Sequence, residues 1–351
     1  MPCAPDRRSW LLPLLAFLYL FPFPYFPALR SPNEGSRLYQ ARALVDDGTL
    51  AVNGPLERYG PMGDLSVYEG KYFPNKAPGI SILGSLVYLI AKLLTGFRPD
   101  GVSNEALTYL LRVCCSGLPT LVFLVPLRRR LWLWAESGLA ADLVLITYAL
   151  GSLAYTYGLL YFSHQLTAVM LCGSWLAIEN SRERESLRAL ALAGLLAGGA
   201  VLVEYTAALA AGPLFIYAAW TARRRIVAAL GFGLASLPPQ LALLAYHDFA
   251  YGSPFRVGYQ NNVSPTFQSW HHEGFMGISS PTLRGLLGSY FDPARGLFIY
   301  CPLLLLAPVG IWLMFKKKER RDAAVFLGVL FILYSYSVSY THLTLPTNRE
   351  V

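Results

Sequence analysis

Charge is scarce in this sequence of 351 residues. Only 14% of the residues are charged, 54% are hydrophobic, and the mean hydropathy is +0.41. A typical soluble protein has about 25% charged residues. This balance excludes an ordinary soluble domain and is typical of a protein solvated by lipid.

Cysteine is also rare, and its spacing matches no known motif. Cys114, Cys115, Cys172 and Cys301 lie in or beside apolar segments, and Cys3 precedes the first of them. No spacing indicates a zinc knuckle or a disulfide framework. We therefore predict that the cysteines are small buried packing residues and that they hold no metal ion.

Repeats and a cleavable leader are absent as well. No period of about 20 to 50 residues recurs, which excludes a solenoid or a propeller. The two halves also lack the matched broken helices typical of an inverted-repeat transporter. Arg7 and Arg8 precede an apolar run without an Ala-x-Ala cleavage site, so residues 1–29 are predicted to hold an uncleaved first span.

Long apolar stretches dominate what is present. About ten of them are long enough to approach the roughly 30 Å of a bilayer core. They cover residues 11–29, 79–96, 105–127, 131–151, 160–179, 187–203, 205–222, 226–246, 297–315 and 323–337. The predicted fold is an all-α polytopic membrane helix bundle, with an extracytoplasmic loop at 30–78 and a multi-span core at 79–337 that contains a polar loop at about 247–295.

The basic residues lie in short clusters between apolar runs, so the net charge of +8 does not indicate a nucleic-acid partner. Arg128–Arg130, Arg223–Arg225 and Lys316–Lys318 are interpreted as membrane-edge anchors. Arg7 and Arg8 place the N-terminus in the cytoplasm and the first loop outside. Counting two further spans then leaves 128–130 outside too, so one crossing between 79 and 127 is miscounted or the early topology overrides charge.

The last residues are expected to be foreign to the fold. Residues 338–343, Val-Ser-Tyr-Thr-His-Leu, resemble a translated adapter from sequencing libraries. Residues 338–351 are therefore predicted to be a non-native tail after a truncation, the alternative being a genuine polar C-terminal tail.

The first loop contains most of the candidate chemistry. Residues 31–34 read as a helix start, and apolar residues at helical spacing up to Gly48 predict an amphipathic helix on the membrane surface. Glu34, Asp46 and Asp47 would lie near its ends. Lys76 would stand at the membrane interface, where its ammonium group suits a phosphate.

These residues resemble a family. Asn33-Glu34, Arg37, Tyr39, Ala41-Arg42, Gly48-Thr49-Leu50 and Tyr72-Phe73-Pro74-Asn75-Lys76-Ala77-Pro78 follow one another in the order found in polyprenol-phosphate-sugar-dependent glycosyltransferases of the C-type fold. The bacterial branch with protein O-mannosyltransferases and lipid A aminoarabinose transferases is the most similar. The resemblance covers about the first 130 residues. Asn33 replaces the usual first acidic residue, and an amide is not a base.

The resemblance implies a membrane enzyme of the bacterial inner membrane that transfers a sugar from a polyprenyl-phosphate donor to a lipid, glycan or protein acceptor. It implies Glu34, Asp46 and Asp47 as candidate catalytic residues. The candidate substrate and phosphate ligands are Asn33, Arg37, Arg42, Lys76 and His164. No cofactor is fixed, and a divalent ion stays an open alternative. The competing class is a non-catalytic relative: a transporter, flippase or scaffold that kept the fold.

Other polar residues have two interpretations each. His164 is either a structural imidazole or a substrate contact, and Glu204 is either a turn residue or a buried functional charge. His271-His272-Glu273 lacks the i, i+4 geometry of a helical zinc motif and is expected in a loop. Aromatic residues such as Tyr259 and Trp270, with Tyr290 and Phe291, fit either a membrane-interface belt or a sugar-stacking wall.

Overall fold

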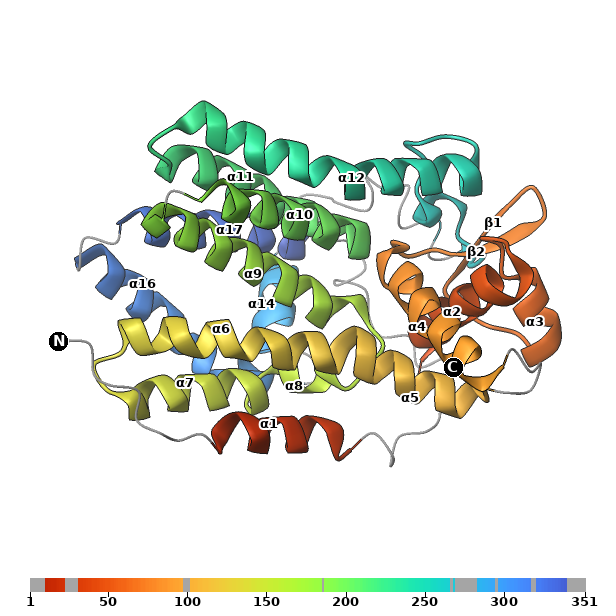
Figure 1. Cartoon of the computed structure of the whole chain (residues 1–351), viewed down its shortest axis with the longest axis horizontal. Helices are drawn as coiled ribbons and strands as arrows, with labels where there is room; N and C mark the ends of the chain where they lie inside the picture. Colours follow the sequence, from red (N-terminus) through yellow and green to blue (C-terminus); the bar gives the residue numbers. More distant parts are fainter. Residues whose placement is uncertain are drawn as a thin grey trace.

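The computed structural model describes residues 10–22, 31–96, 102–184, 186–265, 268, 283–293, 296–316 and 320–339. In this part of the chain the fold is mostly helical, as predicted, with one two-stranded sheet (Figure 1). The α-helices are α1 Leu11–Leu20, α2 Pro32–Arg42, α3 Asn53–Tyr59, α4 Gly79–Thr95, α5 Asn104–Arg112, α6 Leu118–Trp134, α7 Gly138–Leu150, α8 Leu153–Gly158, α9 Ser163–Arg184, α10 Leu187–Val203, α11 Ala208–Thr221, α12 Arg225–Tyr251, α14 Leu283–Phe291, α15 Leu297–Tyr300, α16 Ala307–Lys316 and α17 Arg320–Ser339.

Shorter elements join these helices. The strands are β1 Leu65–Tyr68 and β2 Lys71–Pro74. The π-helical turns are η2 Ala43–Asp47 and η3 Val113–Gly117, and the 3₁₀ turns are η4 Tyr205–Ala207, η5 Gly258–Asn261 and η6 Pro302–Leu306. Because η3 continues α5 into α6, residues 104–134 form one helix.

Two helices in the described part of the chain are long and apolar enough to cross a membrane. They are Asn104–Trp134, with 31 residues, and Arg225–Tyr251, with 27 residues. Further apolar helices of 10–17 residues include α1, α4, α7 and α10. Most of the predicted spans therefore fall on helices shorter than the roughly 20 residues that a bilayer core requires.

Helices α9 to α12 form a layered group in which α10 and α12 approach each other closely. Gly194 and Gly198 are four residues apart and share one face of α10. A Cβ atom at Gly198 would lie 2.6 Å from the carbonyl oxygen of Ser236 on α12. Small residues at this spacing let two helix backbones touch, as they do in membrane helix pairs.

The folded molecule has polar residues at two opposite ends. Helices α2, α3 and α4 and the strand pair gather at one end, which we call the loop end (Figure 1). The helix of residues 104–134 leads from there to the opposite end, where Arg130 pairs with Glu179 on α9 at 2.5 Å. We call this opposite end, with Arg128, Arg130, Arg182, Arg223 and Arg224, the arginine end.

Helix α4 bears on the conflict between span counting and charge. Lys92, in its last turn, donates a hydrogen bond of 2.6 Å to Asp46 of the first loop. Asn104, where α5 begins, accepts one of 2.9 Å from Arg42. The last turn of α4 and the start of α5 therefore both contact the first loop, and residues 104–134 lead from there to the arginine end. Arg128–Arg130 lie at the end opposite the first loop. The crossing assigned to residues 79–96 stays a prediction.

Helix α2 is enclosed by protein, whereas the sequence predicted an amphipathic helix on a membrane surface. All residues from Glu34 to Arg42 are buried. The polar ones find partners: Gln40 donates to the Tyr246 hydroxyl at 2.9 Å, and Arg42 donates to the Tyr88 hydroxyl at 2.8 Å. The prediction failed because these partners lie far away in the sequence, so the polar face looked like a solvated one.

A β-hairpin shapes the second half of the first loop. Its strands pair antiparallel from Leu65 with Pro74 to Tyr68 with Lys71. The turn residues Glu69 and Gly70 both have positive φ, at 50° and 75°, as a two-residue type I′ turn requires. The hairpin places the residue before β1 opposite the residue after β2.

Candidate functional site

Polar side chains from distant segments meet at the loop end. Arg37 lies on α2, Asp64 precedes β1, Lys76 follows β2, Ser163 begins α9, and Glu204 follows α10. We call these residues the loop-end cluster.

A hydrogen-bonded chain joins three members of the cluster. Arg37 Nη2 donates to Ser163 Oγ at 3.0 Å, and that hydroxyl donates to Glu204 Oε2 at 2.7 Å. Arg37 Nη1 also donates to the backbone carbonyl of Asn33 at 3.2 Å. The guanidinium of Arg37 is thereby fixed in orientation, with Glu204 as a nearby counter-charge.

Lys76 and Asp64 form the second part of the cluster. Lys76 Nζ lies 3.7 Å from Asp64 Oδ1, and it lies 5.1 Å from the centre of the Tyr259 ring. Both the ion pair and the cation–π contact favour a charged ammonium group. The hairpin accounts for this pairing, because the amide of Asn75 donates to the carbonyl of Asp64 at 3.1 Å and so closes the loop at its base.

The backbone of Asp64 has an uncommon conformation. Its φ is 55°, in the left-handed region, which aspartate adopts more readily than most residues. Residues with an uncommon backbone conformation cluster at active sites and ligand-binding sites. The conformation here belongs to a carboxylate that faces a lysine at the edge of the hairpin.

Burial acts on both cations of the cluster. It lowers the pKa of the Arg37 guanidinium, against the opposing effect of Glu204. Burial likewise lowers the pKa of Lys76, which Asp64 raises in part and nearby Arg37 lowers further. Asp64 and Glu204 offset the two cations, so an anion that binds here must displace Asp64 from Lys76.

Exposure separates the positioning groups from those a ligand can reach. Arg37 is only 1% exposed. The side chains of Asp64 and Lys76 are 28% and 21% exposed, and that of Glu204 is 16% exposed. A ligand can therefore contact Lys76 and both carboxylates, with Arg37 behind them.

Several buried polar atoms near the cluster have unused hydrogen-bonding capacity. Asn33 Oδ1, Ser36 Oγ, Arg37 Nε and Asn75 Oδ1 are buried and have no hydrogen-bond partner among the described residues. Buried polar atoms are nearly always satisfied in proteins. Such a group of donors and acceptors suits a polar ligand better than an apolar one.

Glu34, a predicted catalytic residue, lies deeper than the cluster. Its carboxylate accepts two hydrogen bonds of 2.8 Å from Arg112 and one of 2.9 Å from the backbone amide of Tyr161. Glu34 and Arg112 are both 0% exposed. A carboxylate held in this way ties α2 to the helix of residues 104–134, and a substrate reaches it only if the pair opens.

The other predicted carboxylates lie at the far end of α2. Asp46 binds Lys92 at 2.6 Å and lies 3.7 Å from Arg42. Asp47 binds Arg58 through two hydrogen bonds of 2.8 Å. Arg42 is fully engaged with neighbouring groups, so these residues form a separate ion-pair network and do not join the loop-end cluster.

The remaining predicted residues divide in the same way. Asn33 and His164 lie beside the cluster, with His164 Nδ1 3.7 Å from Glu204 Oε2. Tyr259 belongs to the cluster's rim, whereas Tyr290 and Phe291 contact Phe298 elsewhere. Trp270, the residues 271–273 and the tail at 340–351 lie outside the described residues.

Sequence reasoning missed Asp64 and Arg112. A Glu-Gly turn between alternating residues is a hairpin signal, and it would have placed Asp64 opposite Asn75, next to Lys76. Arg112 lies inside an apolar helix, where an ionisable residue is functional or paired by default. Glu204 does lie at a turn, as one of its two interpretations required, yet it also faces the cluster.

The described residues contain no group of three or more His, Cys, Asp or Glu side chains that could hold a metal ion. Comparison with known proteins adds no family to this picture: no family model matches the chain, and neither a curated protein nor a solved structure matches it.

Proposed function

We propose that the chain is a multi-pass protein of the bacterial inner membrane. It transfers a sugar from a polyprenyl-phosphate donor to a hydroxyl acceptor at the outer face of that membrane. The observation behind this proposal is the pairing of two cations, Arg37 and Lys76, with the reachable carboxylates Asp64 and Glu204. A phosphate next to a base is what such a transfer needs.

The donor phosphate binds at Lys76, with Arg37 behind it. Lys76 contributes a charge-assisted bond to the phosphate, and the buried Arg37 contributes positive charge from behind it. Charge-assisted bonds of this kind strengthen as negative charge develops on the leaving phosphate. The polyprenyl chain extends into the surrounding lipid.

Asp64 acts as the general base. Its contact with Lys76 is 3.7 Å long, and Lys76 turns to the phosphate once the donor is bound. The freed carboxylate takes the proton of the acceptor hydroxyl while that oxygen attacks the anomeric carbon. The bond from the anomeric carbon to the phosphate oxygen breaks with its electron pair on the phosphate, and the configuration inverts. One carboxylate is sufficient because phosphate is already a workable leaving group.

Glu204 has a positioning role in this scheme. It holds Ser163, which accepts the hydrogen bond from Arg37. Aromatic faces next to Lys76, such as that of Tyr259, offer a surface on which a sugar ring can stack.

Membranes containing the chain test this function. Polyprenyl phosphates that carry a radiolabelled hexose or pentose are added, and transfer of label to membrane acceptors is measured against membranes without the chain. The proposal expects chain-dependent transfer. Movement of the labelled lipid between leaflets without transfer would instead support the non-catalytic alternative, a flippase, which Asn33 at the usual acidic position favours.

A further inference from the structure

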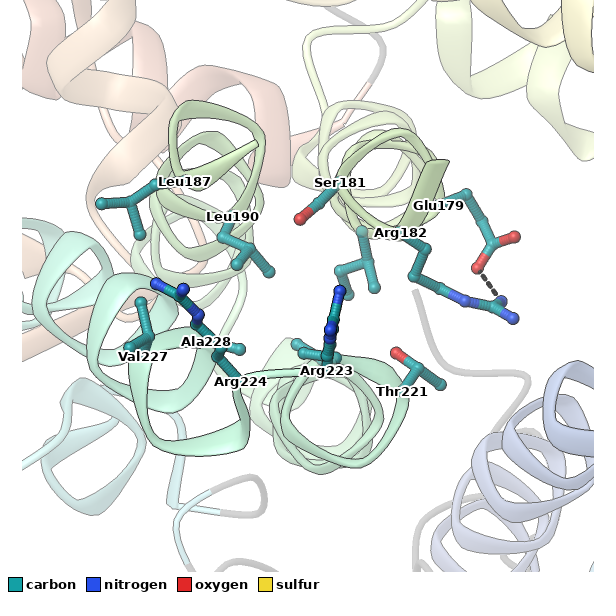
Figure 2. A pocket seen from close by; sticks show the side chains of 13 residues that line it. Glu179, Ser181, Arg182, Leu187, Leu190, Thr221, Arg223, Arg224, Val227 and Ala228 are labelled. Carbon is teal, nitrogen blue, oxygen red and sulfur yellow. Dashed lines mark hydrogen bonds and ion pairs between the residues drawn. The ribbon is translucent and has the colours of Figure 1, made fainter. Parts of the chain in front are cut away.

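A cavity lies at the arginine end, away from the loop-end cluster. It has a volume of about 690 Å³ and lies where α9, α10, α11 and α12 meet (Figure 2). This volume falls within the range of about 300 to 1,000 Å³ that is typical of small-molecule sites.

Cations dominate the polar part of this cavity. Arg182, Arg223 and Arg224 line it. Figure 2 shows Arg223 and Arg224 extending from the turn between α11 and α12 toward the space in front of α9 and α10. Among the described residues of the lining, Glu179 is the acidic one, and it already binds Arg182 at 2.6 Å and Arg130 at 2.5 Å. The described lining therefore carries a net positive charge.

Two further hydrogen-bond donors at the cavity also favour a bound anion. Ser181 is 7% exposed, and Figure 2 shows its hydroxyl facing the cavity. Arg224, the N-cap residue of α12, makes no side-chain capping bond, so the first amides of that long helix stay available. A helix start of this kind attracts negative charge.

The other wall of the cavity is apolar. Leu190 and Ala228 are buried in it, whereas Leu187 and Val227 line it and are 54% and 45% exposed. Exposed apolar side chains directly beside arginines suit an amphiphile, with its anionic head at the guanidinium groups and its hydrocarbon along the leucines. A hydrophilic anion would gain nothing from this second wall.

We propose that this cavity binds the phosphate head group of an anionic phospholipid, with its acyl chains along Leu187 and Val227. The site is independent of the sugar-transfer proposal, because it lies at the opposite end of the molecule and shares no residue with the loop-end cluster. It places a lipid between α10 and the start of α12.

Binding of short-chain phosphatidylglycerol to the purified chain in detergent, measured by native mass spectrometry or calorimetry, tests the site. Phosphatidylcholine of the same chain length and inorganic phosphate are the comparison ligands. We expect phosphatidylglycerol to bind at least about tenfold more tightly than either. Arg223→Gln and Arg224→Gln should each weaken it about tenfold, because each removes a charge-assisted contact.

Arg225→Gln is the matched control, since Arg225 is the adjacent exposed arginine outside the lining. It should leave binding within about twofold of the unchanged chain. Ser181→Ala should weaken binding with an unchanged unfolding temperature. Equal losses of phosphatidylglycerol affinity in Arg225→Gln and Arg224→Gln would show that surface charge alone accounts for binding. Equal affinity for inorganic phosphate and phosphatidylglycerol would show a site for free anions. Either result, or undiminished binding in the Arg223 and Arg224 variants, overturns the proposal.

Discussion

Glu34 and Arg112 form a bidentate ion pair with both hydrogen bonds at 2.8 Å, and neither side chain is exposed. The pair links the start of α2 to the long helix of residues 104–134. Removing one partner of such a buried pair lowers the free energy of unfolding strongly, because the remaining charge stays buried without its counter-ion. Its first role is therefore structural.

This relationship gives a stability prediction. Glu34→Gln leaves the Arg112 charge buried without its counter-ion and should lower the free energy of unfolding by about 3 to 5 kcal/mol. Asp47→Asn is the matched control, because Asp47 makes the same bidentate contact with Arg58 in partly exposed surroundings. It should change the free energy of unfolding by less than about 1 kcal/mol. Thermal unfolding in detergent micelles measures both, and equal shifts would contradict the assignment.

Lys76 should make donor binding sensitive to pH. Burial holds its pKa below the ordinary value of 10.5. Phosphate binding needs the protonated amine, so affinity for polyprenyl phosphate should fall as the pH rises through a value below 10.5. Lys76→Arg stays charged and should bind with little change across that range. Lys71→Arg, on the exposed face of β2, is the control, and its pH profile should match that of the unchanged chain.

The close contact between α10 and α12 gives a packing prediction. Gly198→Ala would place a methyl group 2.6 Å from the Ser236 carbonyl oxygen, so the two helices must separate. We expect a loss of about 1 to 3 kcal/mol in the free energy of unfolding. Gly233 on α12 is the matched control, because a Cβ atom there would meet only the Phe215 ring within 4 Å, at 3.8 Å. Gly233→Ala should therefore be neutral or slightly stabilising, and a similar loss in both variants would argue against close helix contact.

The sequence predicted the helical class of this fold because apolar runs and helical spacing are local signals. The crossing predicted for residues 79–96 falls on α4, an apolar helix of 17 residues whose last turn contacts the first loop. Length and hydropathy alone do not reveal this contact, since it depends on Lys92 meeting Asp46 and Arg42 meeting Asn104.

The candidate site was predictable only in part. Arg37 and Lys76 were found from the first loop, and both belong to the loop-end cluster. Their partners Ser163 and Glu204 lie on segments that follow much later in the chain, so a single sequence does not reveal their proximity. Glu34 stays a predicted base. The structure gives it Arg112 as a partner, which the sequence offered no means to foresee.

The most direct test of the account is the rate of sugar transfer by Asp64→Asn compared with Glu69→Gln. Both changes replace a hairpin carboxylate with an amide, but only Asp64 faces Lys76. In proteoliposomes supplied with a polyprenyl-phosphate sugar on which the unchanged chain is active, Asp64→Asn should lower turnover by about 10² to 10⁴ with donor affinity little changed. Glu69→Gln should keep full turnover. Full activity in Asp64→Asn would contradict the account.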